Sequence, residues 1–95
     1  MKFTFHEEAL KEYDAALNYY ISRSEVVARA FAGEFEFSVN EVTADPLRWR
    51  KEGESARIYR MPNFPYTLIY RSTSDEIVLL ALARHRRRPG YWDRR

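Results

Sequence analysis

The 95-residue sequence contains no cysteine. This absence excludes a disulfide framework and catalysis by a thiol, although it says little about the cellular compartment. The longest apolar run is IVLLALA at 77–83, which is far shorter than the roughly 20 residues of a membrane-spanning helix. Charges interrupt the N-terminal MKFTFHEEAL at once, so the pattern of a signal peptide is missing. We therefore expect a cytoplasmic protein with no membrane partner.

Several catalytic motifs are also missing. With three glycines in all, the chain has no glycine-rich phosphate loop. Neither His6 nor His85 is accompanied by a second histidine or a suitably spaced carboxylate, so no metal site is expected. Serine, histidine and aspartate are too sparsely grouped to indicate a catalytic triad. We expect no cofactor.

The composition is that of one small folded domain, which we expect to span residues 1–95. Apolar residues make up 45% of the chain and aromatic residues 16%, enough for a compact core. The net charge of +2 is unevenly distributed. Residues 84–95 carry six arginines against Asp93 (+5), whereas residues 1–83 carry ten basic against thirteen acidic residues (−3). This concentration suggests a polyanion or an acidic partner, and the alternative is a solvated tail.

Apolar periodicity predicts an α+β fold of β-α-α-β-β-β order, with a helical hairpin packed on one face of a small, mostly antiparallel sheet. His6 and Ser24 stand where helix caps belong, and Asp45-Pro46 should end the second helix. The segment 47–55 is expected to be a polar loop. In chain order, the expected elements are a strand at 2–5, helices at about 7–22 and 25–44, and strands at 57–61, 66–71 and 77–83.

The two helices carry three apolar stripes. The first helix is expected to bury Leu10, Tyr13, Leu17, Tyr20 and Ile21. The second helix should turn one stripe to the core: Val27, Phe31, Phe35, Ser38 and Val42. A further stripe on its opposite side would pack on the first helix or on a second chain: Val26, Ala30, Gly33 and Phe37. We expect Leu10, Leu17, Phe31 and Phe35 to form the contact between helices and sheet.

Alternation along the last strand predicts where its end points. Val78, Leu80 and Leu82 should share one face with Arg84, and Ile77, Leu79 and Ala81 should share the other with His85. Arg60, Arg71 and Arg84 are candidates for cations near the open face, unless they are ordinary surface arginines. His85 is a candidate catalytic group or else a structural or exposed histidine.

The pair Pro89-Gly90 should end the strand and turn the chain. Tyr91 and Trp92 would then fold back and bury area against the rim of the sheet. The alternative is that these rings stack on RNA bases.

Three stretches resemble the RelE/ParE superfamily of toxins from bacterial type II toxin–antitoxin modules: FTFHEEALKEYDAALNYYISRS, RIYRMPNFPYTLIYR and IVLLALARHRRRPGYW. The resemblance covers nearly the whole chain, in order. Its most specific parts are FPYTLIYR and the ending RRRPGYW, which is more similar to the ParE-like branch, the plasmid stabilisation proteins. The ending is thus more similar to a family terminus than to a random basic tail.

If the chain acts like RelE, the resemblance implies cleavage of mRNA in the ribosome. The catalytic candidates would then be His85, Tyr91, Arg60 and Arg84, as base, acid and phosphate-binding cations. Two positions depart from that pattern, because Thr67 replaces a strand arginine and His85 replaces the arginine after the last strand. Neutral Thr67 cannot stabilise developing charge as an arginine does, which argues against RNase activity. ParE-like sequences, in turn, usually have histidine where this chain has Arg84.

If the chain acts like ParE, the resemblance implies inhibition of DNA gyrase by binding, and neutralisation by a cognate antitoxin whose C-terminal segment wraps the toxin. This is our leading interpretation. The alternatives are a ribosome-dependent mRNA endonuclease and a diverged, non-toxic relative that still binds an antitoxin. The residues expected to contact a partner or target are Phe37, Arg84, Arg86, Arg87, Arg88, Tyr91 and Trp92.

Overall fold

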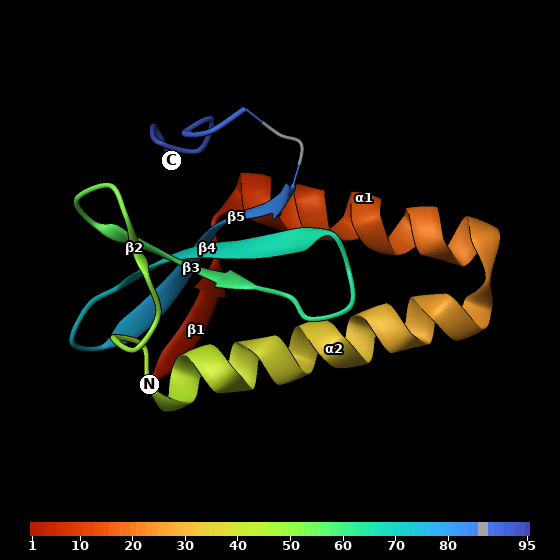
Figure 1. The fold of residues 1–95 in the computed structure, drawn as a ribbon, viewed down its shortest axis with the longest axis horizontal. Helices are drawn as coiled ribbons and strands as arrows, with labels where there is room; N and C mark the ends of the chain where they lie inside the picture. The colour runs from red at the N-terminus through yellow and green to blue at the C-terminus, as the bar shows by residue number, and fades with distance from the viewer. Residues whose placement is uncertain (86–87) are drawn as a thin grey trace.

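The structure, a computed structural model, describes residues 1–85 and 88–95 (Figure 1). The predicted α+β order is confirmed, with one addition: the segment 47–55, expected to be a loop, contains a two-residue strand. The elements are β1 (Lys2–Phe5), α1 (Glu7–Arg23), α2 (Glu25–Ala44), β2 (Lys51–Glu52), β3 (Ala56–Arg60), β4 (Tyr66–Ser72) and β5 (Glu76–Arg84).

Both predicted helix caps are confirmed. The backbone N–H of Glu8 donates to Nδ1 of His6 over 3.1 Å, and that of Val27 donates to Oγ of Ser24 over 3.3 Å. Each cap satisfies a backbone donor that has no partner within its helix. Asp45 ends α2, as the following proline predicts.

The sheet has the order β1-β5-β4-β3-β2, and only the β1–β5 pair is parallel. The longest strand, β5, is therefore an interior strand. It is apolar on both faces because the helices pack on one face and the end of the chain packs on the other. Strand β1 pairs with β5 only from Glu76 to Leu79. Beyond Leu79, no strand among the described residues borders that edge of β5.

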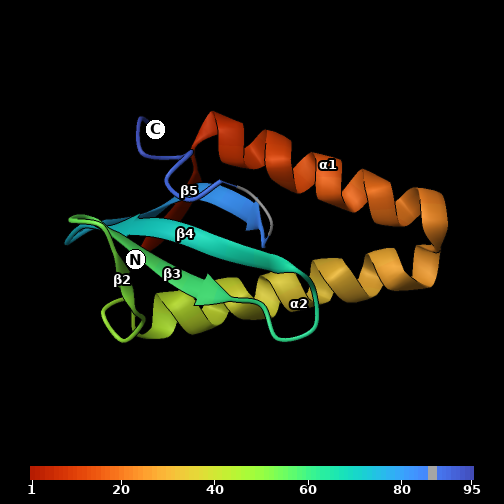
Figure 2. The ribbon, with the colours of Figure 1, turned by 45° about the horizontal axis from the view of Figure 1, so that its top comes forward.

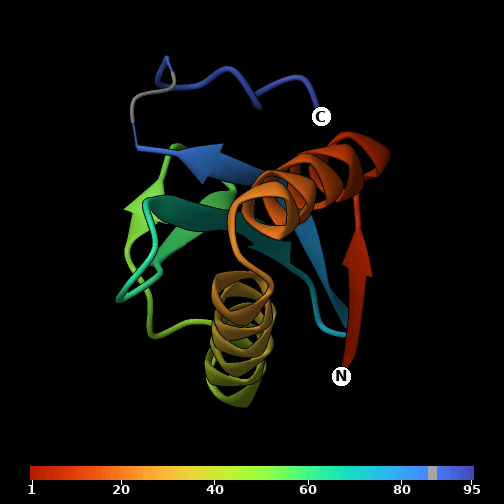
Figure 3. The same ribbon diagram turned by 90° about the vertical axis from the view of Figure 1, so that its right-hand side faces the viewer.

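The second helix and the end of the chain lie on different sides of the sheet. Figure 2 shows that the helical hairpin extends past the sheet where α1 meets α2. In Figure 3, α2 lies below the strands and residues 88–95 lie above them. We call residues 88–95 the C-terminal segment.

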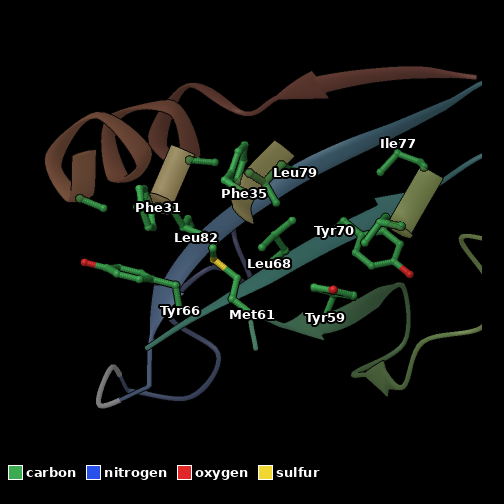
Figure 4. Close-up of a cluster of buried hydrophobic side chains, with 13 residues drawn as sticks. Phe31, Phe35, Tyr59, Met61, Tyr66, Leu68, Tyr70, Ile77, Leu79 and Leu82 are labelled. Carbon is green, nitrogen blue, oxygen red and sulfur yellow. The ribbon is translucent and has the colours of Figure 1, made fainter. Parts of the chain in front are cut away.

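The larger core lies between the hairpin and the sheet (Figure 4). Phe31 and Phe35 are buried there, and the half-buried Leu17 packs against them, as predicted. The prediction for Leu10 was wrong, because its side chain is 45% exposed. The small neighbours Ala9 and Ala16 are buried instead. We call this core the helix-side cluster: Ala9, Ala16, Phe31, Phe35, Val42, Tyr59, Met61, Tyr66, Leu68, Tyr70, Ile77, Leu79 and Leu82.

Two more residues expected in the core are exposed. Ile21 is 53% exposed and Val27 39% exposed, and both lie near the junction of α1 and α2. This end of the hairpin extends past the sheet, so the stripe finds no strand to cover it (Figure 2). Periodicity identified the apolar faces of the helices but not how far the sheet reaches beneath them.

The predicted alternation along β5 is confirmed as far as Leu80 and was wrong from Ala81. Tyr70 pairs with Leu79, whereas the preceding Ile69 pairs with Ala81, so Leu80 is an extra residue in a β-bulge. Leu80 and Ala81 consequently pack on the same side, and Leu82 turns to the helices. One inserted residue thus exchanges the faces of everything that follows it.

A second, smaller core lies on the opposite side of the sheet. The C-terminal segment folds back and Trp92 becomes 8% exposed, which confirms the prediction for this ring. We call this the C-terminal cluster: Ala56, Ile69, Leu80, Ala81, Ala83 and Trp92. Within the described ranges, no helix is long and apolar enough to cross a membrane.

Candidate functional site

The C-terminal segment is held by a tight turn. Gly90 has a φ of +77°, a conformation that favours glycine, and a Cβ atom there would lie 2.8 Å from Oδ2 of Asp93. The N–H of Asp93 donates to the carbonyl of Gly90 over 3.0 Å. The turn directs the following Trp92 into the C-terminal cluster.

The last residue of the chain ties this segment to α1. Arg95 donates to both carboxylate oxygens of Glu12, over 2.8 and 3.1 Å, and to the carbonyl of Leu80 over 3.1 Å. Glu12 also accepts the N–H of Leu82 over 3.0 Å. These two charged side chains thereby satisfy backbone groups on the edge of β5 that β1 does not reach.

The Glu12–Arg95 pair is shielded from solvent, with side chains 19% and 15% exposed. Burial acts to lower the pKa of Arg95, but the hydrogen bonds and charge of Glu12 outweigh this effect and raise the pKa above its usual value. Arg95 is therefore a structural group. It was counted in the basic patch expected from the sequence, but its charge is neutralised within the fold.

A cleft of about 280 Å³ lies between the C-terminal segment and one part of the sheet. That part consists of the end of β3, the start of β4 and the end of β5. A neighbouring hollow of about 310 Å³ adds Trp49 and shares four of the lining residues. We call the two together the basic cleft, because it is lined by Arg50, Arg60, Arg84, His85 and Arg88, with Glu52, Ile58, Thr67, Ile69, Ala83 and other residues of the C-terminal segment.

The sheet register positions the centre of this cleft. Thr67 of β4 pairs with Arg60 of β3 on one side and with Ala83 of β5 on the other. His85 follows Ala83 by two residues, and its N–H donates to the carbonyl of Pro65 over 3.1 Å. Arg60, Thr67 and His85 therefore come together from three adjacent strands.

Arg60 and His85 are in direct contact. Nη2 of Arg60 lies 3.2 Å from Nδ1 of His85. Because a guanidinium can only donate, Nδ1 must accept in this contact, and the proton of the neutral imidazole then sits on Nε2. Two groups that can carry positive charge thus touch without a carboxylate between them.

Arg84 points away from the middle of the cleft. Its guanidinium carbon lies 5.6 Å from the ring centre of Tyr66, in the helix-side cluster. It also lines a separate cavity of about 190 Å³ between α1 and the edge of β5, together with Glu12 and Tyr91. The bulge at Leu80 is the cause, because Arg84 follows Leu82 to the side of the helices.

The remaining sequence candidates are dispersed. Arg71 lies at the other end of β4, opposite Val78, and therefore away from Arg60 and Arg84. Arg88 is exposed at the rim of the basic cleft, and Tyr91 is half-buried beneath the guanidinium of Arg95, 4.9 Å from its ring centre. Arg86 and Arg87 lie outside the described residues.

Phe37 does not belong to the basic cleft. Its side chain is 53% exposed on α2, which lies across the molecule from the C-terminal segment (Figure 3). It follows Val26, which is 75% exposed, and Gly33, around which a Cβ atom would meet nothing within 4 Å. The second stripe of this helix is therefore an open apolar surface, and it does not pack on α1 as one interpretation held.

Sequence reasoning missed several residues of the site. Glu12 looked like an ordinary polar position of an amphipathic helix, and Arg50 like part of a polar loop. No sequence signal distinguishes them, because their roles depend on contacts with distant strands. Among the residues that the structure describes, no group of three or more histidine and acidic side chains could hold a metal ion.

The fold and the site define a small α+β protein with a basic cleft and a helix, α2, that exposes an apolar face. A family model described as "ParE toxin of type II toxin-antitoxin system, parDE" matches residues 3–89. The chain therefore belongs to the ParE toxin family. A search of curated proteins gave no match.

Among solved structures, the chain is similar to one described as "Chromosomal ParDE TA system from P. aeruginosa". The TM-score is 0.74 and the sequence identity 19%, over 88% of this chain and 95% of that chain. At this identity the similarity is one of fold, which agrees with the family that the sequence resemblance indicated.

Proposed function

We propose that this protein is the toxin of a type II toxin–antitoxin module, that it acts by binding and inhibiting a topoisomerase, DNA gyrase, and that a cognate antitoxin neutralises it. The observation that carries the proposal is the match to the ParE toxin family over residues 3–89. The similarity in fold to a chain of a ParDE system supports it. The basic cleft and the open apolar face of α2 support the proposed target and its neutralisation by an antitoxin.

The chemistry of the basic cleft supports binding rather than RNA cleavage. Cleavage needs a base with a free lone pair near the 2′-hydroxyl and a cation for the developing charge. Nδ1 of His85 is occupied by Arg60, and Nε2 then carries the proton. Thr67, at the centre of the cleft, is neutral and therefore cannot serve as this cation.

The target is tested by adding the purified protein to two assays, DNA supercoiling by gyrase and cleavage of mRNA on translating ribosomes. We expect loss of supercoiling and intact mRNA. His85→Gln and Tyr91→Phe should both retain toxicity in cells, because a protein that acts by binding needs no proton donor at one position. Combined replacement of Arg86, Arg87 and Arg88 by alanine should abolish toxicity through weaker binding.

Two other results would each replace this proposal. Ribosome-dependent cleavage that is lost in folded His85→Gln would make the protein an endoribonuclease, with Arg60 and Arg84 as its phosphate-binding cations. Activity in neither assay, together with tight binding to the antitoxin, would indicate a relative that has lost toxicity.

The antitoxin is proposed to cover the open apolar face of α2 and part of the C-terminal region. The support is the exposure of Phe37 and Val26 on that face, together with the positive charge around the basic cleft. Because these surfaces lie on different sides of the molecule, the antitoxin would have to wrap around it (Figure 3).

Replacement of Phe37 by aspartate tests this interface. Phe37→Asp should weaken the complex with the cognate antitoxin while the toxin stays folded. Asn18→Asp is the matched control, since it adds the same charge at an exposed position of α1. Equal affinities for wild type and Phe37→Asp would remove this face from the interface.

A further inference from the structure

A second basic hollow lies at the end of the sheet away from the basic cleft. It has a volume of about 270 Å³ and lies where β3 begins and β4 ends. Figure 1 shows this end of the sheet on the left, opposite the junction of α1 and α2. We call it the distal hollow, and it is lined by Leu47, Lys51, Glu54, Ser55, Ala56, Arg57, Arg71, Ser72 and Thr73.

The distal hollow has an excess of positive charge. Lys51, Arg57 and Arg71 line it, against a single carboxylate, that of Glu54. Among the described residues, none of the three cations lies within ion-pair distance of an acidic side chain. A ligand with negative charge would therefore gain charge-assisted hydrogen bonds here, and no ion pair between described residues would have to break.

The two arginines reach the hollow from opposite faces of the sheet. Arg57 alternates in step with Tyr59 of the helix-side cluster, and Nη1 of Arg57 donates to the carbonyl of Trp49 over 2.8 Å. Arg71 alternates in step with Ile69 of the C-terminal cluster. The bond to Trp49 holds Arg57 in place and leaves its other N–H groups available. One guanidinium group thus lies on each side of the sheet.

The backbone of β4 is open between these two side chains. In an antiparallel ladder, pairs that exchange hydrogen bonds alternate with pairs that do not. The N–H of Thr73 donates to the carbonyl of Glu76, so the next pair, Ser72 and Ile77, exchanges none. The N–H and carbonyl of Ser72 therefore point away from β5. On that side the ladder stops at Tyr70, and no backbone hydrogen bond joins Ser72 to the turn before β3 in the described part of the chain.

These features fit an extended peptide better than a nucleic acid. An extended peptide can pair with the open backbone of Ser72, and its successive side chains then point to opposite faces of the sheet. Two adjacent acidic residues would place one carboxylate beside Arg57 and the other beside Arg71. A carboxylate takes two parallel donors, which a guanidinium group offers. None of the described residues that line the hollow is aromatic, so a nucleic-acid base would find no ring to stack on.

We propose that the distal hollow binds an extended acidic segment of another protein, with adjacent carboxylates held by Arg57 and Arg71 and its backbone paired to Ser72. Lys51, which pairs with Arg57 across β2 and β3, adds a third cation on the face of the helix-side cluster. Leu47 is 67% exposed at the rim and would pack on an apolar residue beside the acidic pair. This site is separate from both surfaces used in the proposed function, and it does not depend on the target of the toxin.

The test is an NMR titration of the wild-type protein with a blocked hexapeptide, acetyl-TVDEVT-amide, whose two acids are flanked by residues that favour extended structure. The amide signals of Ser55, Arg57, Arg71 and Ser72 should shift. The amide hydrogen of Ser72 should also exchange more slowly in the complex, because it becomes hydrogen-bonded. The matched peptide acetyl-TVNQVT-amide keeps the size of the side chains without their charge, and its Kd should be at least about tenfold higher.

Two variants and a control make the test specific. Arg71→Gln should raise the Kd of the acidic peptide about tenfold, and Arg71→Glu should abolish the shifts, because a carboxylate then repels the ligand. Arg23→Gln removes the same charge at an exposed position of α1 and should leave the Kd near that of wild type. Added salt should raise the Kd for wild type and Arg23→Gln alike.

Four outcomes would overturn the proposal. One is the absence of shifts at the four residues, and another is an equal Kd for the acidic and amide peptides. A third is an equal loss of affinity in Arg23→Gln and Arg71→Gln, which would indicate diffuse attraction by the whole surface. The fourth is tighter binding of a six-nucleotide deoxythymidine oligomer with the same shifts, which would assign the hollow to phosphates. Neither a topoisomerase nor an antitoxin is present, so these measurements stand or fall separately from the proposed function.

Discussion

The two apolar clusters on the two sides of the sheet are built differently. The helix-side cluster contains large aromatic rings in contact, such as Tyr13 and Phe35 with ring centres 4.6 Å apart. The C-terminal cluster consists mainly of alanines and short aliphatic side chains beneath one ring, Trp92. The helix-side cluster holds the two helices on the sheet, whereas the C-terminal cluster holds only the C-terminal segment on the sheet. We infer that the first determines whether the protein folds and the second determines the shape of the basic cleft.

The largest effect is expected in the helix-side cluster. Phe35→Ala should lower the free energy of unfolding by about 3–5 kcal/mol, a large part of what a small domain possesses. Phe37→Ala is the matched control, because the same ring two residues later is 53% exposed. Chemical denaturation measures both. Equal stabilities for the two variants would mean that the assignment of the inner face of α2 is wrong.

A smaller and local effect is expected from Trp92→Ala. Removing the one large ring of the C-terminal cluster should detach the C-terminal segment at a cost of about 1.5–3 kcal/mol, while the rest of the protein stays folded. Carboxypeptidase should then trim the chain faster, and the amide signals of Ala81 and Ala83 should shift. Arg94→Ala, at an exposed neighbour, is the control. Unfolding of the whole domain by Trp92→Ala would contradict the division of roles between the two clusters.

The ion pair that connects the C-terminal segment to α1 should contribute somewhat less. Glu12→Gln keeps the shape of the side chain but removes the charge that holds Arg95 and accepts the N–H of Leu82. We expect a loss of about 1–3 kcal/mol in thermal or chemical unfolding. Glu36→Gln, at an exposed position of α2, should change little. A loss of the same size in both variants would show that Glu12 has no special structural role.

The smallest effect concerns Tyr70 and alkaline pH. Burial raises the pKa of Tyr70 from 10.0 to about 12. The unfolded chain releases this proton near pH 10 and the folded chain near pH 12, so the stability it contributes is present below pH 10 and is lost as the pH rises to 12. Tyr70→Phe should flatten this dependence, at a cost of about 1 kcal/mol at neutral pH for its hydrogen bond to Pro46.

Unfolding by denaturant at several alkaline pH values measures the dependence for Tyr70→Phe. The exposed Tyr19 provides the comparison, since Tyr19→Phe should leave the slope as it is in the wild type. A slope unchanged in Tyr70→Phe would assign the alkaline sensitivity to other groups. Tyr13 and Tyr20 are candidates, because burial raises the pKa of each.

Much of the fold was predictable from local patterns. The caps at His6 and Ser24 and the aromatic stripe of α2 were all found from residue type and spacing. These features depend on interactions within a few residues of the chain, which the sequence contains directly. The candidate site was less predictable. His85 and Arg60 were identified as candidates, but their contact was not, because it depends on the register of three strands.

By itself, the sequence determined the order of helices and strands, the apolar faces of the helices and the return of the chain at Pro89-Gly90, because periodicity and turn chemistry act locally. Only the tertiary structure decided the rest. The bulge at Leu80 turned Arg84 to the side of the helices, and the short β1 left an edge of β5 that Glu12 and Arg95 occupy. The physical reason is that register and edge contacts join residues far apart in the chain, and a one-residue shift in register reverses the faces of a strand without changing its apolar pattern.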